Sequence, residues 1–295
     1  MTDTKRIFLI VNPISGTKDK NAEISKIQHF LQEHDVSFSL VSTLYKGHAS
    51  QLAHRAVADG YKTIVAVGGD GTVNEVASAL TGNKAALGII PCGSGNGLAR
   101  NLGLPFSPAK ALETILNGKT RCIDYCTVNG LKYFCAFGTG FDAAVAHTFA
   151  GLPHRGLFNY IKSAIQVYKN YNPHSYHIKL QDQEIEGEYY MVAVCNGAQY
   201  GNNAYIAPKA LDNDGLLDIV LVKPVSFLKK IDATFKMFLR TINDGQNITY
   251  RKSPHMEISD NTDRIIKAHI DGEPIELKGK LRLQCHNKQL TVFIP

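Results

Sequence analysis

The sequence predicts two domains, an α/β N-terminal domain with a mostly parallel sheet and a β-rich sandwich domain that follows it. The chain has 295 residues, which is long for one ordinary domain and suits two. Residues 1–125 alternate apolar strand patterns with helical patterns, whereas residues 126–295 carry mainly short alternating runs separated by turns. Hydrophobic residues make up 44% and charged residues 20%, so the chain can bury a core, which excludes disordered polymers and disulfide-dense miniproteins.

The first 125 residues follow a β-α-β-α order. An apolar run at residues 7–11 predicts a first strand, and the helical spacing of the apolar residues after it predicts a helix. This pair of patterns then recurs, which is typical of parallel strands joined by helices. The predicted strands cover residues 7–11, 36–42, 64–67 and 87–90, and the predicted helices cover residues 24–31, 49–58 and 73–80.

The second half of the chain has the texture of a mostly antiparallel β domain. Its short alternating runs are separated by turn residues rather than by long helical patterns. The predicted strands include residues 133–137, 176–180, 189–195, 217–222, 265–270 and 290–294, and helical patterns cover residues 158–168 and 226–242.

Charge and cysteine usage narrow the class of partner and the compartment. The 32 Lys and Arg against 26 Asp and Glu give a net charge of +6, which suits a polyanionic ligand or an anionic membrane surface. The basic residues are dispersed, so we expect no nucleic-acid binding. No segment has the roughly 20 apolar residues of a membrane-spanning helix, and the start lacks a signal-peptide core. The six cysteines form no CxxC pair, which favours buried thiols in a reducing cytoplasm.

Three glycine-rich loops follow apolar strands in the N-terminal half, at residues 12–16, 68–72 and 93–97. Glycine lets backbone N–H groups approach a ligand closely, and a helix N-terminus favours an anion. One such loop is usually an ordinary turn, but three at the carboxyl ends of strands in one sheet favour a phosphate site. The P-loop motif, the protein-kinase motifs and the strict dinucleotide fingerprint are all missing from the sequence.

The three loops together resemble the signature motifs of the diacylglycerol kinase and sphingosine kinase family of lipid kinases. The resemblance continues through residues 137–142, 207–218 and 269–273, in order and over nearly the whole chain. It implies transfer of the γ-phosphate of ATP to a lipid alcohol, with Mg²⁺. The residues that it assigns to nucleotide binding are Asn12, Ser15, Gly16, Thr43, Gly68, Gly69, Asp70, Gly71, Thr72, Glu75, Gly93, Ser94, Gly95, Asn96 and Glu273.

Asp271 is the expected general base, with Asp70 as the alternative, because some members of the family use the aspartate of the GGDG motif. In a strand, residues two apart face the same side, so the Asp271 and Glu273 carboxylates could point in one direction. Without the resemblance, a surface hairpin turn would be the better interpretation of the Asp-Gly-Glu sequence.

Two magnesium sites are predicted. Asp70 and Asp124 are candidates for the ion of the reaction, directly or through water, although Asp124 is equally well interpreted as a turn carboxylate. Asp212, Asp214 and the Leu216 carbonyl could hold a second, structural ion, as in bacterial members of the family. A solvated turn is nearly as good an interpretation of those three residues.

A lipid acceptor implies peripheral, reversible contact with a membrane, so we expect a cytoplasmic protein that associates with membrane surfaces. Residues 226–242 and 158–168 carry apolar stripes flanked by basic residues, and each could dock on lipid or pack against the β domain. An edge strand could support a homodimer. The rival functions are an NAD kinase-like enzyme with a soluble acceptor, since GGDGT also occurs there, and a nucleotide- or lipid-binding regulator without catalysis.

Overall fold

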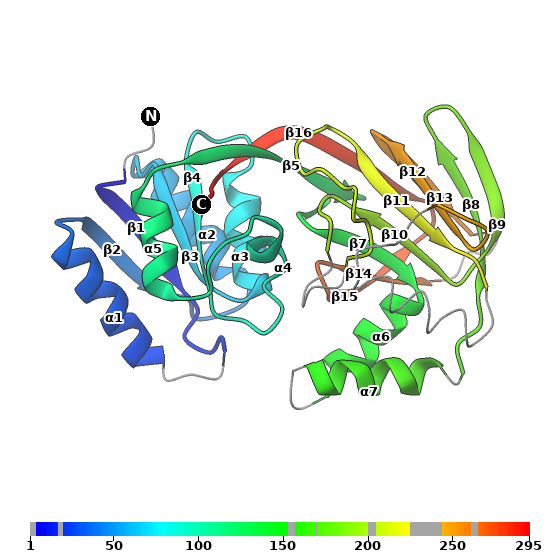
Figure 1. The fold of residues 1–295 in the computed structure, drawn as a ribbon, viewed down its shortest axis with the longest axis horizontal. Helices are drawn as coiled ribbons and strands as arrows, with labels where there is room; N and C mark the ends of the chain where they lie inside the picture. Colours follow the sequence, from blue (N-terminus) through cyan, green and yellow to red (C-terminus); the bar gives the residue numbers. More distant parts are fainter. Residues whose placement is uncertain are drawn as a thin grey trace. The chain divides into compact units, whose positions relative to one another are not determined.

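The computed structural model describes residues 4–16, 20–152, 157–168, 170–199, 205–224, 244–260 and 265–295. It divides the chain into two compact units, Met1–Ile123 with Lys288–Pro295 and Asp124–Asn287 (Figure 1). Residues 288–295 therefore return to the first unit, which the bounds 1–125 and 126–295 from the sequence did not include.

The first unit is an α/β unit built around a parallel sheet. Its sheet order is β2-β1-β3-β4, and the end of β16 pairs with β4 in parallel through Thr291 and Val292. Helices α2 and α3 pack against each other and against this sheet, while α1 packs against α5. The elements are β1 Arg6–Val11, α1 Lys20–Glu33, β2 Ser37–Ser42, α2 His48–Ala58, β3 Thr63–Gly68, α3 Asp70–Leu80, β4 Ala86–Pro91, α4 Gly97–Asn101 and α5 Pro108–Leu116.

Continuous burial explains why the central strands β3 and β4 are mostly apolar runs. Every residue of β3 and of β4 is buried, because helices cover a parallel sheet on both faces. The core joins apolar side chains of the sheet to those of α1 and α5. The predicted parallel α/β architecture of the N-terminal domain is confirmed.

The second unit consists of two antiparallel sheets. One has the order β12-β11-β10-β7-β14-β15, and the other runs β16-β13-β8-β9, with β5 pairing to β16 and to β6. The strands are β5 Thr120–Val128, β6 Leu131–Tyr133, β7 Ala136–Gly140, β8 His174–Leu180, β9 Glu184–Tyr189, β10 Met191–Cys195, β11 Leu217–Val222, β12 Ile248–Ser253, β13 His255–Ser259, β14 Ile265–Ile270, β15 Glu273–Lys278 and β16 Leu281–Phe293, and the helices are α6 Phe141–Ala150 and α7 Leu157–Tyr168.

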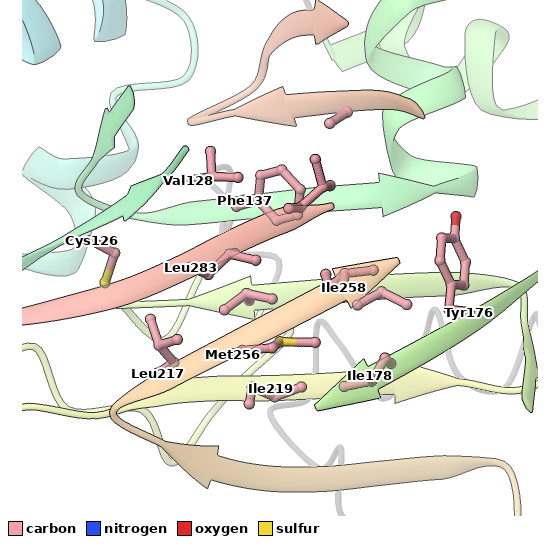
Figure 2. Packing of buried hydrophobic residues seen from close by; sticks show 14 of the residues in the cluster. Cys126, Val128, Phe137, Tyr176, Ile178, Leu217, Ile219, Met256, Ile258 and Leu283 are labelled. Carbon is pink, nitrogen blue, oxygen red and sulfur yellow. The ribbon is translucent and has the colours of Figure 1, made fainter. Parts of the chain in front are cut away.

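The core of the second unit lies between its two sheets. Phe137 and Ile219 of the six-stranded sheet meet Ile178, Met256 and Leu283 of the other sheet (Figure 2). Alternate residues of each strand enter this core, as the period-2 pattern of the sequence predicts. The expectation of a β-rich sandwich is therefore confirmed.

The two apolar stripes considered for lipid contact have different outcomes. Residues 225–243, which include the predicted helix 226–242, lie outside the described residues. The stripe at 158–168 falls on α7, which packs against α6, although Ile165 of this helix is 57% exposed. Among the helices that the structure describes, none is long and apolar enough to cross a membrane.

Candidate functional site

The three glycine-rich loops meet at one edge of the parallel sheet. They follow β1, β3 and β4, which are adjacent in the sheet order. A Cβ atom on Gly16 would lie 2.4 Å from the Cys92 carbonyl oxygen, and a Cβ atom on Gly93 would lie 2.8 Å from the Cα atom of Gly69. The backbones of the loops thus approach one another closely at glycine positions that admit no side chain. We call the surface formed by residues 12–16, 68–72 and 93–97 the cradle.

Asp70 links the second loop to the third. It is the first residue of α3, and its two carboxylate oxygens accept the backbone N–H groups of Asn96 at 2.8 Å and Gly97 at 2.6 Å. Asn96 has a left-handed backbone with a φ of 52°, and its side chain closes the turn by bonding both backbone groups of Gly93. Asp70 therefore fixes the shape of the Gly93–Asn96 loop and the start of α4.

Asn12 links the first loop to the second. Its Nδ2 atom donates to the Thr72 hydroxyl at 3.0 Å, and its backbone carbonyl accepts the Ser15 hydroxyl at 2.9 Å. The Thr72 side chain in turn lies against Gly68, where an added Cβ would approach within 2.7 Å. Thr43 follows β2 at the same edge, with its backbone N–H bonded to the Val11 carbonyl. The structure therefore brings the predicted loop residues of the first unit together.

Glu75 closes the N-terminus of a neighbouring helix. Its carboxylate accepts the backbone N–H groups of Gly47 at 2.8 Å and Ala49 at 3.1 Å, at the start of α2. These are N–H groups that a helix cannot satisfy from within. Its contact with a nucleotide, expected from the sequence, stays a prediction.

Replacing Glu75 with alanine is expected to lower the free energy of unfolding by about 1–2 kcal/mol, the range of a lost helix cap. Urea unfolding followed by circular dichroism measures this. Glu113→Ala on the exposed face of α5 is the matched control, and we expect it to change stability little. Equal losses in the two variants would contradict the capping role of Glu75.

Asp271 occupies a two-residue turn between β14 and β15. Its φ is 48° and that of Gly272 is 83°, while Ile270 and Glu273 pair across the hairpin. The sequence expectation that Asp271 and Glu273 share one face of a strand is therefore wrong, because Asp271 lies in the turn and strand alternation does not apply to it. Glu273 is the first residue of β15.

The Asp271 carboxylate is hydrogen-bonded to the backbone at the start of β7. Its oxygens accept the backbone N–H groups of Phe134 at 3.0 Å, Cys135 at 2.8 Å and Ala136 at 3.0 Å. Three N–H donors on one carboxylate stabilise its negative charge and fix its orientation. The turn is thus anchored to the strand that precedes the glycine-rich segment 137–142.

Asp142 and His269 form a buried aspartate–histidine pair beside this turn. The sequence motifs gave neither residue an individual role. His269 of β14 contacts Asp142 of α6 at 3.1 Å between Nε2 and Oδ2, and the two side chains are about 5% exposed. They lie against Gly138, where an added Cβ would stand 2.1 Å from the Asp142 carboxylate. His147 of α6 also bonds the carbonyls of Ala268 and Ile275. Helix α6 therefore holds the hairpin that carries Asp271.

Asp124 is fully buried in β5 and organises the loop before β11. Its backbone N–H donates to the Asp212 carbonyl at 2.6 Å, and its carboxylate accepts the Gly215 N–H at 2.7 Å. Its carbonyl oxygen accepts Nδ2 of Asn196, a buried side chain that also donates to the Phe134 carbonyl. Asp124 is a buried strand carboxylate and not the turn carboxylate that was the alternative interpretation of the sequence.

Asp214, one of the predicted structural magnesium ligands, is bonded to donors of the protein itself. One Asp214 oxygen accepts the Leu216 N–H at 3.1 Å, and the other contacts Lys252 Nζ at 2.7 Å. Throughout the described ranges, no three His, Cys, Asp or Glu side chains are grouped so that they could hold a metal ion. Because both oxygens of Asp214 already have protein donors, one of them the Lys252 ammonium group, this carboxylate does not fit the metal site expected from Asp212, Asp214 and Leu216.

The electrostatics of this loop centre on Asp218. Burial raises the pKa of Asp218, while hydrogen bonds from Tyr250 and Lys252 act in the opposite direction. For Lys252 burial acts to lower the pKa, but the carboxylates of Asp214 and Asp218 outweigh it and the pKa is raised. Lys252 therefore stays protonated beside the two carboxylates.

The predicted site residues fall into both units. Asn12, Thr43, Glu75, Asp70 and the glycine loops belong to the first unit, whereas Asp124, Asp212, Asp214, Asp271 and Glu273 belong to the second. Within the second unit, Asn196 and Asp271 bond opposite backbone groups of Phe134, so Asp124 and Asp271 are tied to the same segment.

Two family models match the chain. The model described as the diacylglycerol kinase catalytic domain matches residues 6–128, and the model described as the YegS C-terminal NAD kinase beta sandwich-like domain matches residues 135–294. Together they cover both units of the structure.

Known proteins resemble the chain over nearly its full length. A diacylglycerol kinase from Bacillus subtilis is 29% identical over 278 residues, which are 91% of this chain and 90% of the relative. A protein named Probable lipid kinase YegS-like from Pseudomonas aeruginosa is 30% identical over 299 residues, 99% of this chain and 95% of the relative. The crystal structure of a diacylglycerol kinase from Bacillus anthracis has the same fold, with a TM-score of 0.78 at 22% identity, covering 99% and 97% of the two chains.

Proposed function

Because this chain belongs to the family of diacylglycerol kinases and YegS-like lipid kinases, we propose that it transfers the γ-phosphate of ATP to the hydroxyl of a lipid alcohol. The observation that carries the proposal is the cradle of three glycine-rich loops, joined through Asp70 and Asn12 at the edge of the parallel sheet. Such loops let backbone N–H groups bind phosphate oxygens.

The nucleotide binds to the first unit in this proposal. Backbone groups of residues 68–72 and 93–96 hold its phosphates, with Asn12, Ser15, Gly16 and Thr43 around them. Mg²⁺ neutralises charge on the phosphates when it is bound. Asp70 and Asp124 are the carboxylates proposed to bind this ion, directly or through water.

Asp271 acts as the general base. Its carboxylate takes the proton of the lipid hydroxyl, the hydroxyl oxygen forms a bond to the γ-phosphorus, and the bond to the β-phosphate oxygen breaks to release ADP. Asp70 is the alternative base. Glu273, at the end of the same hairpin as Asp271, is proposed to contact the nucleotide.

A lipid substrate requires contact with a membrane surface, which we propose to be peripheral and reversible in a cytoplasmic protein. The net charge of +6 supports attraction to anionic lipids. The acceptor itself is set by the shape of its pocket, since one methylene changes binding by only about 1–3 kcal/mol.

The test is transfer of labelled γ-phosphate from Mg-ATP to purified acceptors in mixed micelles. Diacylglycerol, a sphingoid base and phosphatidylglycerol are offered in parallel, with NAD as a soluble acceptor. We expect label in one lipid and none in NAD. ATP binding without label in any acceptor would contradict the enzyme and favour a nucleotide-binding regulator.

A kinase of a soluble acceptor is the second candidate. It is favoured by one observation, the match of residues 135–294 to a domain described as NAD kinase beta sandwich-like. Label in NAD and in no lipid would establish it in place of the lipid kinase.

A further inference from the structure

A lysine side chain, Lys252, lies where the sequence predicts a structural cation. The loop before β11 and the start of that strand carry Asp212, Asp214 and Asp218, and buried Asp124 contacts the loop from β5. Several carboxylates gathered in so short a segment repel one another unless a positive charge lies among them.

Lys252 supplies such a charge. Its ammonium group lies 2.7 Å from the Asp214 carboxylate and 3.3 Å from the Asp218 carboxylate. The Lys252 side chain is 30% exposed, whereas that of Asp218 is 0% exposed and that of Asp214 is 21% exposed. Lys252 therefore lies at the surface, whereas the Asp218 carboxylate that it contacts is buried and less screened by solvent.

The strand register explains why Lys252 reaches both carboxylates. Lys252 of β12 pairs directly with Asp218 of β11, so their side chains leave the sheet on the same face. Tyr250, two residues earlier on β12, lies on that face too, and its hydroxyl donates to the Asp218 oxygen that Lys252 contacts. A lysine side chain is long enough to touch Asp218 beside it and Asp214 in the loop.

The buried Asp124 carboxylate has a donor from the protein backbone. Asp124 accepts the N–H of Gly215, whose φ of 76° suits the tight turn. The Asp214 oxygen that does not contact Lys252 accepts the N–H of Leu216. Each of these carboxylates therefore has a donor from the protein itself.

We propose that Lys252 serves as the internal cation of this loop and that the loop folds without a divalent metal ion. The proposal concerns folding, so it stands or falls independently of the kinase activity. The lysine takes the place of the structural magnesium ion that the resemblance to bacterial family members implies for this loop.

The test is thermal unfolding of the full chain without nucleotide, in EDTA and in millimolar Mg²⁺. Lys252→Met is compared with Lys267→Met, an exposed strand lysine of the same unit and the same change in net charge. We expect Lys252→Met to lower the midpoint by roughly 5 °C, because two carboxylates lose their counter-ion, and Lys267→Met to lower it by about 1 °C or less. The wild-type midpoint should be the same in both buffers.

A double-mutant cycle with Asp214→Asn separates this pair from effects of magnesium elsewhere. In EDTA, Lys252→Met should cost much less in the Asp214→Asn background than in the wild type. Additive losses would overturn the proposal. A wild-type midpoint that falls in EDTA while that of Asp214→Asn does not would also overturn it, since a divalent ion would then lie at this loop.

Discussion

Replacing Asp271 with asparagine is expected to reduce phosphate transfer to lipid about 100- to 10,000-fold, the usual contribution of a general base. The amide cannot take the proton of the acceptor hydroxyl. Asparagine tolerates the left-handed backbone at this position, so the turn can persist. Steady-state transfer of labelled phosphate measures the loss, and equilibrium binding of ATP should change little, because the glycine-rich loops and Glu273, which are proposed to bind the nucleotide, are unchanged.

The control for this variant is Asp35→Asn. Asp35 is exposed and has a φ of 52°, so the same substitution is made in the same backbone conformation away from the proposed site. A thermal scan of Asp271→Asn shows how much of its loss comes from the bonds to residues 134–136. Full activity in Asp271→Asn with a large loss in Asp70→Asn would move the base to Asp70.

Gly138→Ala is expected to produce the largest loss of stability in the second unit. The new methyl group would lie 2.1 Å from the Asp142 carboxylate and 2.4 Å from the His269 ring, and both of these side chains are buried and in contact with each other. We expect a loss of about 3 kcal/mol or more in the free energy of unfolding, because overpacking is added to a broken buried pair. Denaturant unfolding of the full chain measures it.

The matched control is Gly187→Ala in β9. The nearest atoms to a Cβ there are those of the Tyr189 ring at 3.4 Å, an ordinary contact. The free energy of unfolding of this variant should stay within about 1 kcal/mol of the wild-type value. A Gly138→Ala protein as stable as Gly187→Ala would show that Asp142 and His269 do not pack on Gly138.

The fold could be predicted from local patterns because burial leaves a signature in the sequence. Strands β3 and β4 are buried on both faces and are therefore continuous apolar runs, whereas strands such as β8 alternate buried and exposed residues. Strand β16 was missed over residues 281–289, because polar residues interrupt its apolar pattern there, although residues 281–284 pair with β13.

The site was predicted only in part. The glycine loops were recognisable because the need for close backbone approach restricts the residue type. The roles of Asp142, His269 and Lys252 were not recognisable, because the Asp142–His269 and Lys252–Asp214 contacts join elements far apart in the chain. A surplus of carboxylates near residue 214 could be read from the sequence, but the residue that neutralises it lies 38 positions further on.

The sequence by itself determined the two architectures, the family and the chemistry of the phosphate-binding loops. These depend on residue type and on spacing along the chain. The tertiary structure alone decided what each carboxylate contacts. Asp70 holds the Gly93–Asn96 loop, Asp271 anchors a hairpin, and Asp214 pairs with a lysine. A carboxylate has the same chemistry in all three places, and the donors that the fold brings to it set its role.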